Sequence, residues 1–105
     1  MFDIQLKRGM LEQCVLRVLS AGDSYGYQII KDMSACVEMT ESTLYPILRR
    51  LEAAGALTAY TAEHGGRLRK YYSITAEGER RLAQFLEDWQ QVMEMYEFIR
   101  GEEKA

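Results

Sequence analysis

The residues best suited to binding chemistry in this chain share one face of a short amphipathic segment, STLYPILRRLEAAG, at positions 42–55. The apolar residues of this segment recur at positions i, i+3, i+4 and i+7, which is the spacing of one face of an α-helix. The opposite face combines hydroxyl groups, a phenol and two guanidinium groups. Such a set makes a poor core, but it can hydrogen-bond to an anionic polymer, and in particular to the bases and phosphates of double-stranded DNA. The polar face consists of Ser42, Thr43, Tyr45, Pro46, Arg49 and Arg50.

The ends of the segment predict where this helix begins and ends. Ser42 and Thr43 are both plausible N-caps, and Gly55 can adopt the left-handed backbone conformation that ends a helix. Pro46 is tolerated best in the first turn, where its missing N–H has no partner in any case. We therefore expect the helix to begin within the first four residues of the segment, with its N-terminal end exposed. In the functional interpretation Arg49 reaches a guanine edge or a phosphate in the major groove, and in the alternative this face is simply solvated.

Two further helices are expected before this segment. Residues 6–20 have a clean 3.6-residue apolar face, and residues 25–35 follow a potential N-cap at Ser24. Gly26, near the start of the second helix, suggests either a close approach of another helix or a locally tight backbone. Residues 36–41 would form a short connection. The second helix, this turn and the polar helix would together make a helix-turn-helix.

After residue 55 the pattern changes to that of β-strands. Residues 56–61 and 69–74 are expected to be strands, joined by a turn at residues 63–67 that contains two glycines. A helix-turn-helix followed by a hairpin is a winged helix, and the tip of the hairpin is the wing. Basic wing residues would bind phosphates or enter the minor groove, whereas the alternative is a charge cluster that keeps the hairpin edge soluble. The wing candidates for DNA contact are Gly66, Arg67, Arg69 and Lys70.

A final helix is expected from an N-cap at Thr75 to residue 99 or 100, with an apolar seam close to a coiled-coil repeat. About 25 residues at 1.5 Å each make it roughly 37 Å long, whereas a 75-residue domain is only about 30 Å across. We therefore predict a DNA-binding domain at residues 1–75 and a helix at residues 76–105 that overhangs it and forms a homodimer. The seam residues are either the dimer core or the lining of an apolar pocket for a planar effector at the dimer centre. These residues are Phe85, Trp89, Val92, Met93 and Tyr96.

The net charge of −3 argues against nucleic-acid binding only if it is taken over the whole chain. Residues 1–75 carry nine Lys/Arg and eight Asp/Glu, a net of +1, whereas residues 76–105 carry four and eight, a net of −4. Residues 42–75 alone carry five basic and two acidic side chains. Because binding depends on the local field at the contact surface, the DNA-binding interpretation stands.

The segments TLYPILRRLEAAG and GGRLRKYYSITAEG together resemble the PadR family of bacterial winged helix-turn-helix transcriptional regulators. The resemblance covers most of the chain, from about residue 11 to the last helix, and the short C-terminal part is similar to that of the short subfamily. It implies DNA contacts on the helix that contains TLYP. It also implies a ligand role for Trp89, because an aromatic residue in a similar Glu-x-Trp context stacks on the ligand in multidrug-sensing relatives.

Several other classes of protein find little support. The sequence has one histidine, no nucleophile–base pair, no phosphate-cradling glycine loop and no metal-ligand cluster, so neither an enzyme nor a cofactor is expected. Cys14 lies on an apolar helix face and Cys36 lies in a loop near Glu38, so redox sensing is not favoured. No run of about 18 apolar residues and no signal peptide is present, which favours a cytoplasmic protein without membrane contact.

The sequence thus predicts a mainly α protein with a small β-hairpin, built as a winged helix-turn-helix plus a long C-terminal helix. Its predicted function is that of a dimeric, sequence-specific transcriptional regulator. We expect a repressor that binds a palindromic operator and is released by a small apolar or aromatic effector. The alternative is a winged-helix interaction module that docks a protein partner through its acidic last helix and does not bind DNA.

Overall fold

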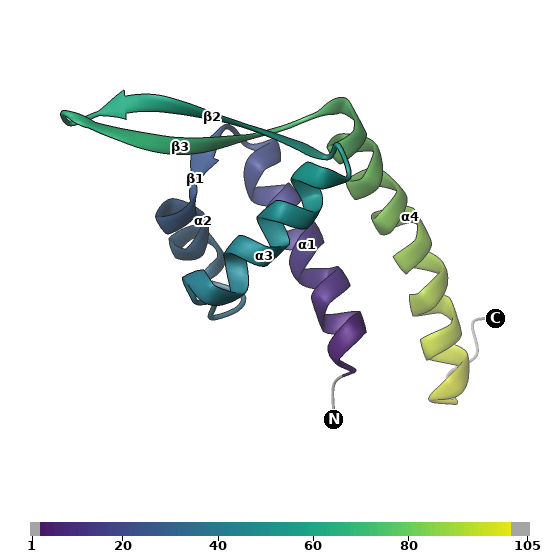
Figure 1. Cartoon of the computed structure of the whole chain (residues 1–105). Coiled ribbons are helices and arrows are strands. Elements are labelled where there is room, and N and C mark those ends of the chain that lie inside the picture. Colours follow the sequence, from purple (N-terminus) through teal and green to yellow (C-terminus); the bar gives the residue numbers. More distant parts are fainter. Residues whose placement is uncertain (1–2, 102–105) are drawn as a thin grey trace.

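The computed structural model describes residues 3–101, in which one antiparallel sheet lies along one side of the helices (Figure 1). In that part of the chain the elements are α1 (Ile4–Ser20), β1 (Ser24–Tyr25), α2 (Gly26–Met33), α3 (Glu41–Ala53), β2 (Leu57–His64), β3 (Arg67–Ile74) and α4 (Ala76–Ile99). The strand order is β1-β3-β2. The predicted winged helix-turn-helix with a long C-terminal helix is therefore confirmed.

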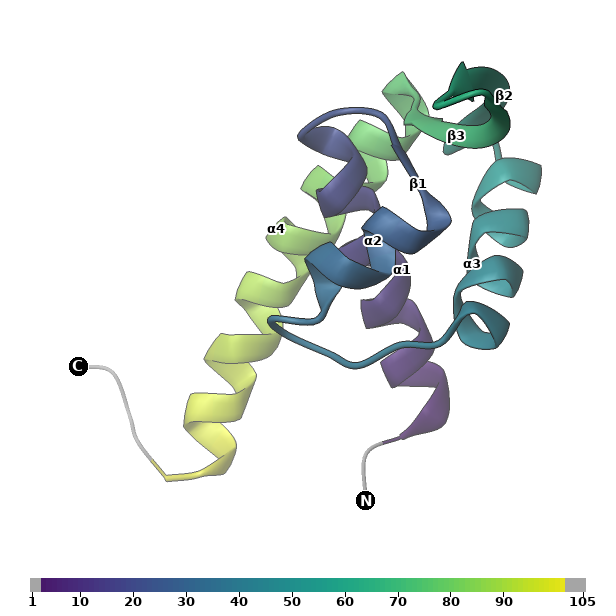
Figure 2. The same ribbon diagram turned by 90° about the vertical axis from the view of Figure 1, so that its left-hand side faces the viewer.

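The core forms where the apolar faces of α1, α2 and α3 meet under the base of the hairpin (Figures 1 and 2). Periodic apolar residues on each helix point to the same interior, because residues three and four apart share a helix face. The side chains with almost no exposed surface come from every one of these elements: Val15, Leu16, Leu19, Ile29, Leu44, Leu48 and Leu57.

The entry into α2 differs from the prediction. Ser24 does not cap the helix; it lies in β1 and pairs with Tyr72 of β3, while Tyr25 is the N-cap. Ser24 is buried, and its hydroxyl has no hydrogen-bond partner among residues 3–101. The helix ends at Met33, two residues earlier than predicted. The prediction was wrong because β1 exists only through its pairing with a strand almost fifty residues later in the chain, at Tyr71 and Tyr72.

The start of α3 also differs. Thr40 is the N-cap, and its carbonyl accepts hydrogen bonds from the N–H groups of Thr43 and Leu44 at 3.1 and 3.0 Å. Ser42 and Thr43 are therefore not caps but residues of the first turn. Pro46 lies in the second turn rather than the first, so it has no N–H to donate to the carbonyl of Ser42, four residues before it.

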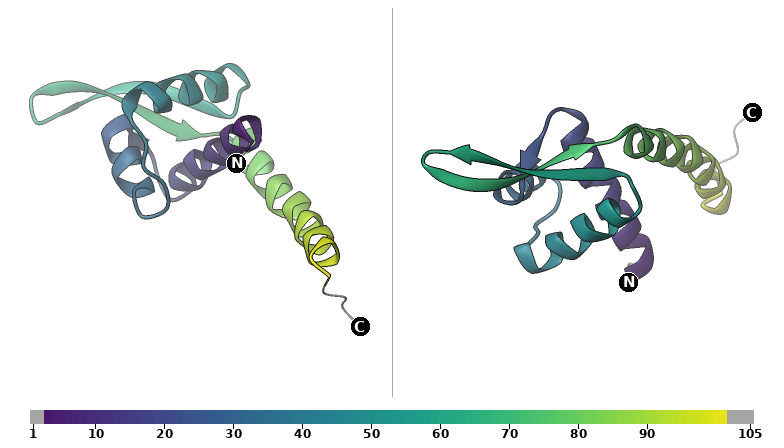
Figure 3. Two further views of the ribbon diagram at one scale, coloured as in Figure 1. Left: turned by 90° about the horizontal axis from the view of Figure 1, so that it is seen from below. Right: turned by 45° about the horizontal axis from the view of Figure 1, so that its top comes forward.

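The wing is a longer and tighter hairpin than predicted. The strands continue to His64 and Arg67, which pair with each other, so that the turn contains only Gly65 and Gly66. Both glycines have positive φ angles, +60° and +80°. Two-residue hairpin turns of this kind need positive φ at both positions, and glycine supplies it without steric cost. The hairpin projects beyond α2 at one end of the molecule (Figures 1 and 3).

Helix α4 begins as predicted and then leaves the domain. The Thr75 hydroxyl accepts a hydrogen bond from the N–H of Gly78 at 3.1 Å, which confirms Thr75 as the N-cap. Gly78 and Leu82 are buried in the first two turns, whereas the later turns project away from the body (Figure 3). The molecule therefore measures 60 × 28 × 21 Å along its principal axes.

Candidate nucleic-acid interface

Helix α3 presents its polar face because its apolar face is completely used by the core. Leu44, Ile47, Leu48 and Leu51 are each at most 2% exposed, which fixes the rotation of the helix about its axis. With that rotation fixed, the predicted binding residues lie on the outside: Ser42, Thr43, Tyr45, Arg49 and Arg50 are exposed, and Pro46 is half-buried between them.

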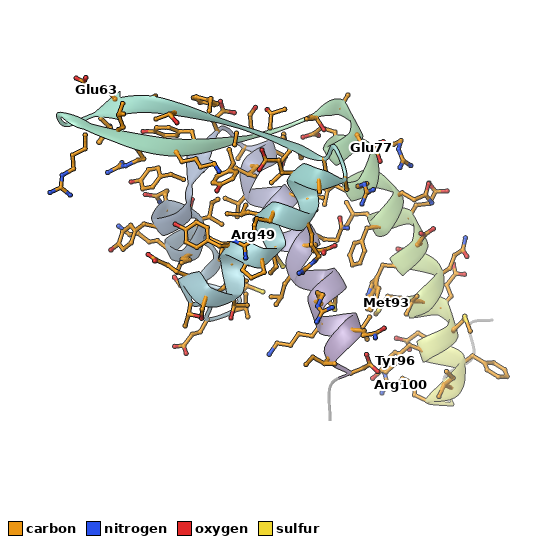
Figure 4. All side chains as sticks on the ribbon, viewed as in Figure 1. Arg49, Glu63, Glu77, Met93, Tyr96 and Arg100 are labelled. Carbon is orange, nitrogen blue, oxygen red and sulfur yellow. The ribbon has the colours of Figure 1, made fainter. Side chains whose placement is uncertain are left out.

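The two neighbouring arginines of α3 have different environments. The Nε of Arg50 donates to Oε2 of Glu12 on α1 at 3.1 Å, so this guanidinium is held against the body of the domain. Arg49, at the middle of α3 (Figure 4), has no carboxylate partner within residues 3–101. It is close enough to Tyr72 to lower the pKa of that phenol, whose overall pKa is nevertheless raised by burial. Arg49 is therefore the arginine of α3 that is available to a ligand.

Tyr45 lies against the start of α2, on the side of α3 that faces the wing. A Cβ added to Gly26 would lie 2.5 Å from the Tyr45 hydroxyl, so glycine is the residue that allows this approach. Of the two alternatives predicted for Gly26, the structure supports the close approach, which the side chain of Tyr45 on α3 makes. Burial, with a smaller effect of Glu41, raises the pKa of Tyr45, whereas Lys70 opposes that shift. The phenol is protonated at neutral pH and can donate a hydrogen bond.

The register of the hairpin separates the basic wing residues onto two faces. Lys70 pairs with Thr61 and Tyr72 pairs with Ala59, and side chains two apart on a strand share a face. Lys70 therefore points to the same side as the buried Tyr72, toward α3. Together with Tyr45 it lines a hollow of about 560 Å³ between α2, α3 and β3.

Arg67 and Arg69 belong to the other face of β3. The guanidinium carbon of Arg69 lies 4.0 Å from the centroid of the Tyr25 ring, a cation–π contact that orients the side chain. Arg67 is exposed next to the turn. The structure therefore brings Lys70 together with the polar face of α3. Arg69 borders the same hollow while it is held against Tyr25, and Arg67 is exposed next to the turn.

A row of tyrosines that the sequence analysis missed crosses the outer face of the sheet. Tyr71 is stacked on Tyr60 and meets Tyr25 edge-on, with ring centroids 5.6 Å apart in both pairs. The Tyr60 hydroxyl donates to Asp23 at 2.6 Å, and this bond raises the pKa of Tyr60. The row ties both strands of the wing to the α1–β1 connection. Its members lie in different strands, so only the strand register could have revealed it.

The predicted dimer and effector residues follow one side of α4. Phe85 and Trp89 are half-buried and stacked, with ring centroids 5.6 Å apart. Met93 and Tyr96 lie farther along the helix, on the side toward α1 (Figure 4). Of the five predicted residues, Phe85 alone borders the apolar cavity of about 380 Å³ between α1, α2 and α4. Val92, Met93 and Tyr96 are exposed at 42%, 43% and 53%.

The same cavity is lined by both cysteines. Cys14 is half-buried, and burial, with a smaller effect of Cys36, raises the pKa of its thiol. Within residues 3–101 no three metal-ligating side chains come together, and no helix there has the length and apolarity to cross a bilayer.

The fold and this surface define the class of winged helix-turn-helix transcriptional regulators. The family model described as the transcriptional regulator PadR-like family matches residues 15–84. The chain belongs to that family, which confirms the resemblance seen in its sequence.

Individual proteins are similar to this chain in sequence and in structure. A protein of Lysinibacillus sphaericus, described as uncharacterized protein X, is 35% identical over 101 residues, which cover 90% of this chain and 92% of that protein. The crystal structure of smu.1704 from Streptococcus mutans UA159 is 39% identical, covers 93% of both chains and has a TM-score of 0.80. Bacillus subtilis PadR in complex with operator DNA is 27% identical with a TM-score of 0.66, over 72% of this chain and 46% of that one.

Proposed function

We propose that this PadR-like transcriptional regulator acts as a homodimeric repressor that binds a palindromic operator and is released by a planar apolar effector. The observation that carries the proposal is the exposed apolar strip on the last turns of α4. The side chains of Val92, Met93, Tyr96 and Ile99 are exposed at 42–76%. Apolar strips of this kind mark interaction surfaces.

A second copy of the chain is the occupant that fits this strip. The strip continues the same side of α4 that packs on the domain at Leu82 and Phe85, with the seam spacing of helices that pair with one another. Helix α4 diverges from the N-terminal part of α1 toward its own C-terminal end (Figure 2). The α4 of a partner would fill that space, so we assign dimerisation to residues 76–105 and DNA binding to residues 1–75. Residues 1–2 and 102–105 of these two ranges lie outside the part of the chain that the structure describes.

In the proposed complex, α3 of each protomer enters a major groove. Arg49 reaches a guanine edge or a phosphate, and the hydroxyls of Ser42 and Thr43 bind phosphates. Tyr45 and Lys70 contact the DNA backbone beside the wing. Because Arg50 is bound to Glu12, we assign it to the positioning of α3 rather than to base reading.

The wing would contact the neighbouring minor groove, with Gly66 allowing a close backbone approach and Arg67 supplying charge. Arg69 would bind a phosphate while its guanidinium stays on the ring of Tyr25. Two α3 helices held by an α4 pair would read half-sites about 34–36 Å apart, which requires a palindromic operator. The relative from Bacillus subtilis is in complex with operator DNA, which supports operator DNA as the partner of this chain. Occupancy of such a site excludes other proteins from it, which is why we propose a repressor.

The proposed effector site lies where the two α4 helices meet. The stacked Phe85 and Trp89 offer a flat aromatic surface, and Met93 can adapt its shape to a ligand. A ligand bound there releases DNA only if it binds more tightly to a dimer whose two DNA-binding domains lie at an angle different from that of the DNA-bound dimer. Trp89 is the single tryptophan of the chain, so its fluorescence should respond to planar aromatic compounds, and a Trp89→Phe variant should lose this signal.

Selection of bound sequences from random duplex DNA tests the proposal most completely. We expect an enriched palindrome whose half-sites are centred about one helical turn apart. Arg49→Ala should enrich it much more weakly than wild type. Enrichment of a lone half-site would contradict the dimeric mode, and no enrichment at all by the wild type would contradict sequence-specific binding.

A further inference from the structure

A second basic surface lies next to α3, on the side away from the wing. A groove of about 310 Å³ opens between the first turns of α1 and the first half of α3. Its lining combines apolar side chains, namely Ile4, Leu11, Pro46 and Ile47, with polar and basic ones. The polar and basic residues of the lining are Lys7, Arg8, Ser42, Thr43 and Arg50.

The charge in this groove is not neutralised from within. The acidic side chain beside it, Glu12, is already bound to Arg50 at 3.1 Å. Asp3, at the start of α1, accepts hydrogen bonds from the N–H groups of Gln5 and Leu6 as the helix cap. Lys7 and Arg8 have no carboxylate partner in the described part of the chain. Both cations are therefore available to an anion.

The first turn of α3 adds donors at the same place. The hydroxyl of Thr40 lies 2.9 Å from that of Ser42 and 3.3 Å from that of Thr43, so these three side chains form one cluster. A helix N-terminus also carries partial positive charge that favours an anion. These features add to the two cations of α1, which are the independent observation that points to a ligand.

We propose that this groove binds a phosphate of the DNA backbone. That phosphate would lie on the side of the major groove that is farther from the wing. The inference rests on the proposed insertion of α3 into DNA and deepens it. Phosphates line both sides of a major groove about 12 Å wide. Lys70 and the wing would bind phosphates on one side of the major groove, and Arg8 and Lys7 would bind a phosphate on the other side. The guanidinium of Arg8 can bind two phosphate oxygens at once, whereas Lys7 acts as a point charge.

This contact adds affinity and fixes the register of the protein without reading bases. A phosphate contact can therefore be distinguished by experiment from a contact to a base. The loss of Arg8 or Lys7 should weaken binding to every duplex by the same factor, and it should reduce the dependence of binding on salt. Each phosphate contact contributes about 0.9 to the slope of log K against log salt concentration.

The test compares Arg8→Gln, Lys7→Gln and the double variant with wild type at several salt concentrations. Two duplexes of equal length are used, the selected operator and a scrambled version of it. Arg80→Gln is the matched control, because it removes one positive charge from α4, where Arg80 is bound to Glu77. Arg8→Lys tests whether charge alone restores binding.

The expected result is equal weakening on both duplexes, with the slope reduced by about one for each single variant and about two for the double variant. Arg80→Gln should leave the slope unchanged, and Arg8→Lys should restore most of it. Slopes equal to that of wild type in all three variants would overturn the inference while leaving operator binding intact. Weakening on the operator alone would also overturn it, because it would reveal base reading. If Arg8→Gln lowers the melting temperature, its weaker binding could come from partial unfolding. The slope measured for Lys7→Gln then decides whether the groove binds a phosphate. A wild-type protein that binds neither duplex would refute the proposed function itself.

Discussion

Helices α3 and α4 are both amphipathic, yet the domain buries the whole apolar face of α3 and only the beginning of that of α4. The apolar face of α3 is buried from Leu44 to Leu51, and what remains exposed is a polar, basic face. On α4 the last fully buried apolar side chain is Leu82, Phe85 and Trp89 are half-buried, and the large apolar side chains from Val92 onward are exposed. The comparison teaches that the exposed side chains of a helix point to the kind of partner it suits, and on this basis we propose a polyanion for α3 and an apolar helix for α4.

The largest expected effect comes from the buried face of α3. Leu48 is 1% exposed, so Leu48→Ala leaves a cavity and should lower the free energy of unfolding by about 2–5 kcal/mol. Leu68, 78% exposed on the wing, is the matched control, and its change to alanine should stay within about 0.5 kcal/mol. Urea denaturation at one fixed protein concentration measures both. Equal effects of the two variants would contradict the assignment of the core.

The polar face of α3 allows a comparison of two neighbouring residues of the same type. Arg49→Ala should weaken operator binding by about 1–3 kcal/mol and leave the melting temperature nearly unchanged. Arg50→Ala removes an exposed ion pair with Glu12, so it should cost about 0–1 kcal/mol of stability and affect binding less. Titrations by fluorescence anisotropy, together with thermal melts, separate the two. Operator binding that survives Arg49→Ala intact would show that the groove assignment is wrong.

The packed half of α4 should be sensitive to a single methyl group. A Cβ on Gly78 would collide with the carbonyl oxygen of Ala56, which accepts a hydrogen bond from the N–H of Thr75 at 3.0 Å and cannot move freely. We expect Gly78→Ala to destabilise the protein by about 1–3 kcal/mol in denaturant titrations. Gly9→Ala in α1, where nothing lies within 4 Å of the new Cβ, should be neutral or stabilising. A neutral Gly78→Ala would mean that α4 does not pack as described.

The smallest effect concerns the first turn of α4. Hydrogen bonds from Arg80 and Arg81 lower the pKa of Glu77 to about 2, from an ordinary value of 4.5. Since the folded-state pKa is the lower one, the stabilisation is complete above pH 4.5 and is lost as the pH falls toward 2. The melting temperature of wild type should exceed that of Glu77→Gln at pH 6, and the difference should shrink on acidification. A difference independent of pH would exclude this ion pair as its cause.

Patterns local in sequence predicted most of the fold. Apolar spacing placed the helices, and the two glycines placed the wing. Features that depend on distant residues could not be found in this way. Glu12 and Arg50 are 38 positions apart, and this pairing decides which arginine of α3 is available.

The same limit applies to the rest of the site. Strand β1 and the tyrosine row require the register of β3, which the local pattern does not contain. Conversely, the cap at Thr75 and the end of α4 at Ile99 follow from neighbouring residues, and the structure confirms both.

The central claim is that the exposed strip of α4 is covered by a second copy, and the mass of the protein in solution tests it most directly. Sedimentation equilibrium at micromolar concentration should give twice the mass of one chain. Met93→Glu, which places a charge in the strip, should shift the protein toward single chains. Gln91→Glu, two residues away and on the opposite side of α4, should leave the dimer intact. A wild-type protein that sediments as one chain would contradict the account, since neither the spacing of operator half-sites nor an effector site between two α4 helices could then exist.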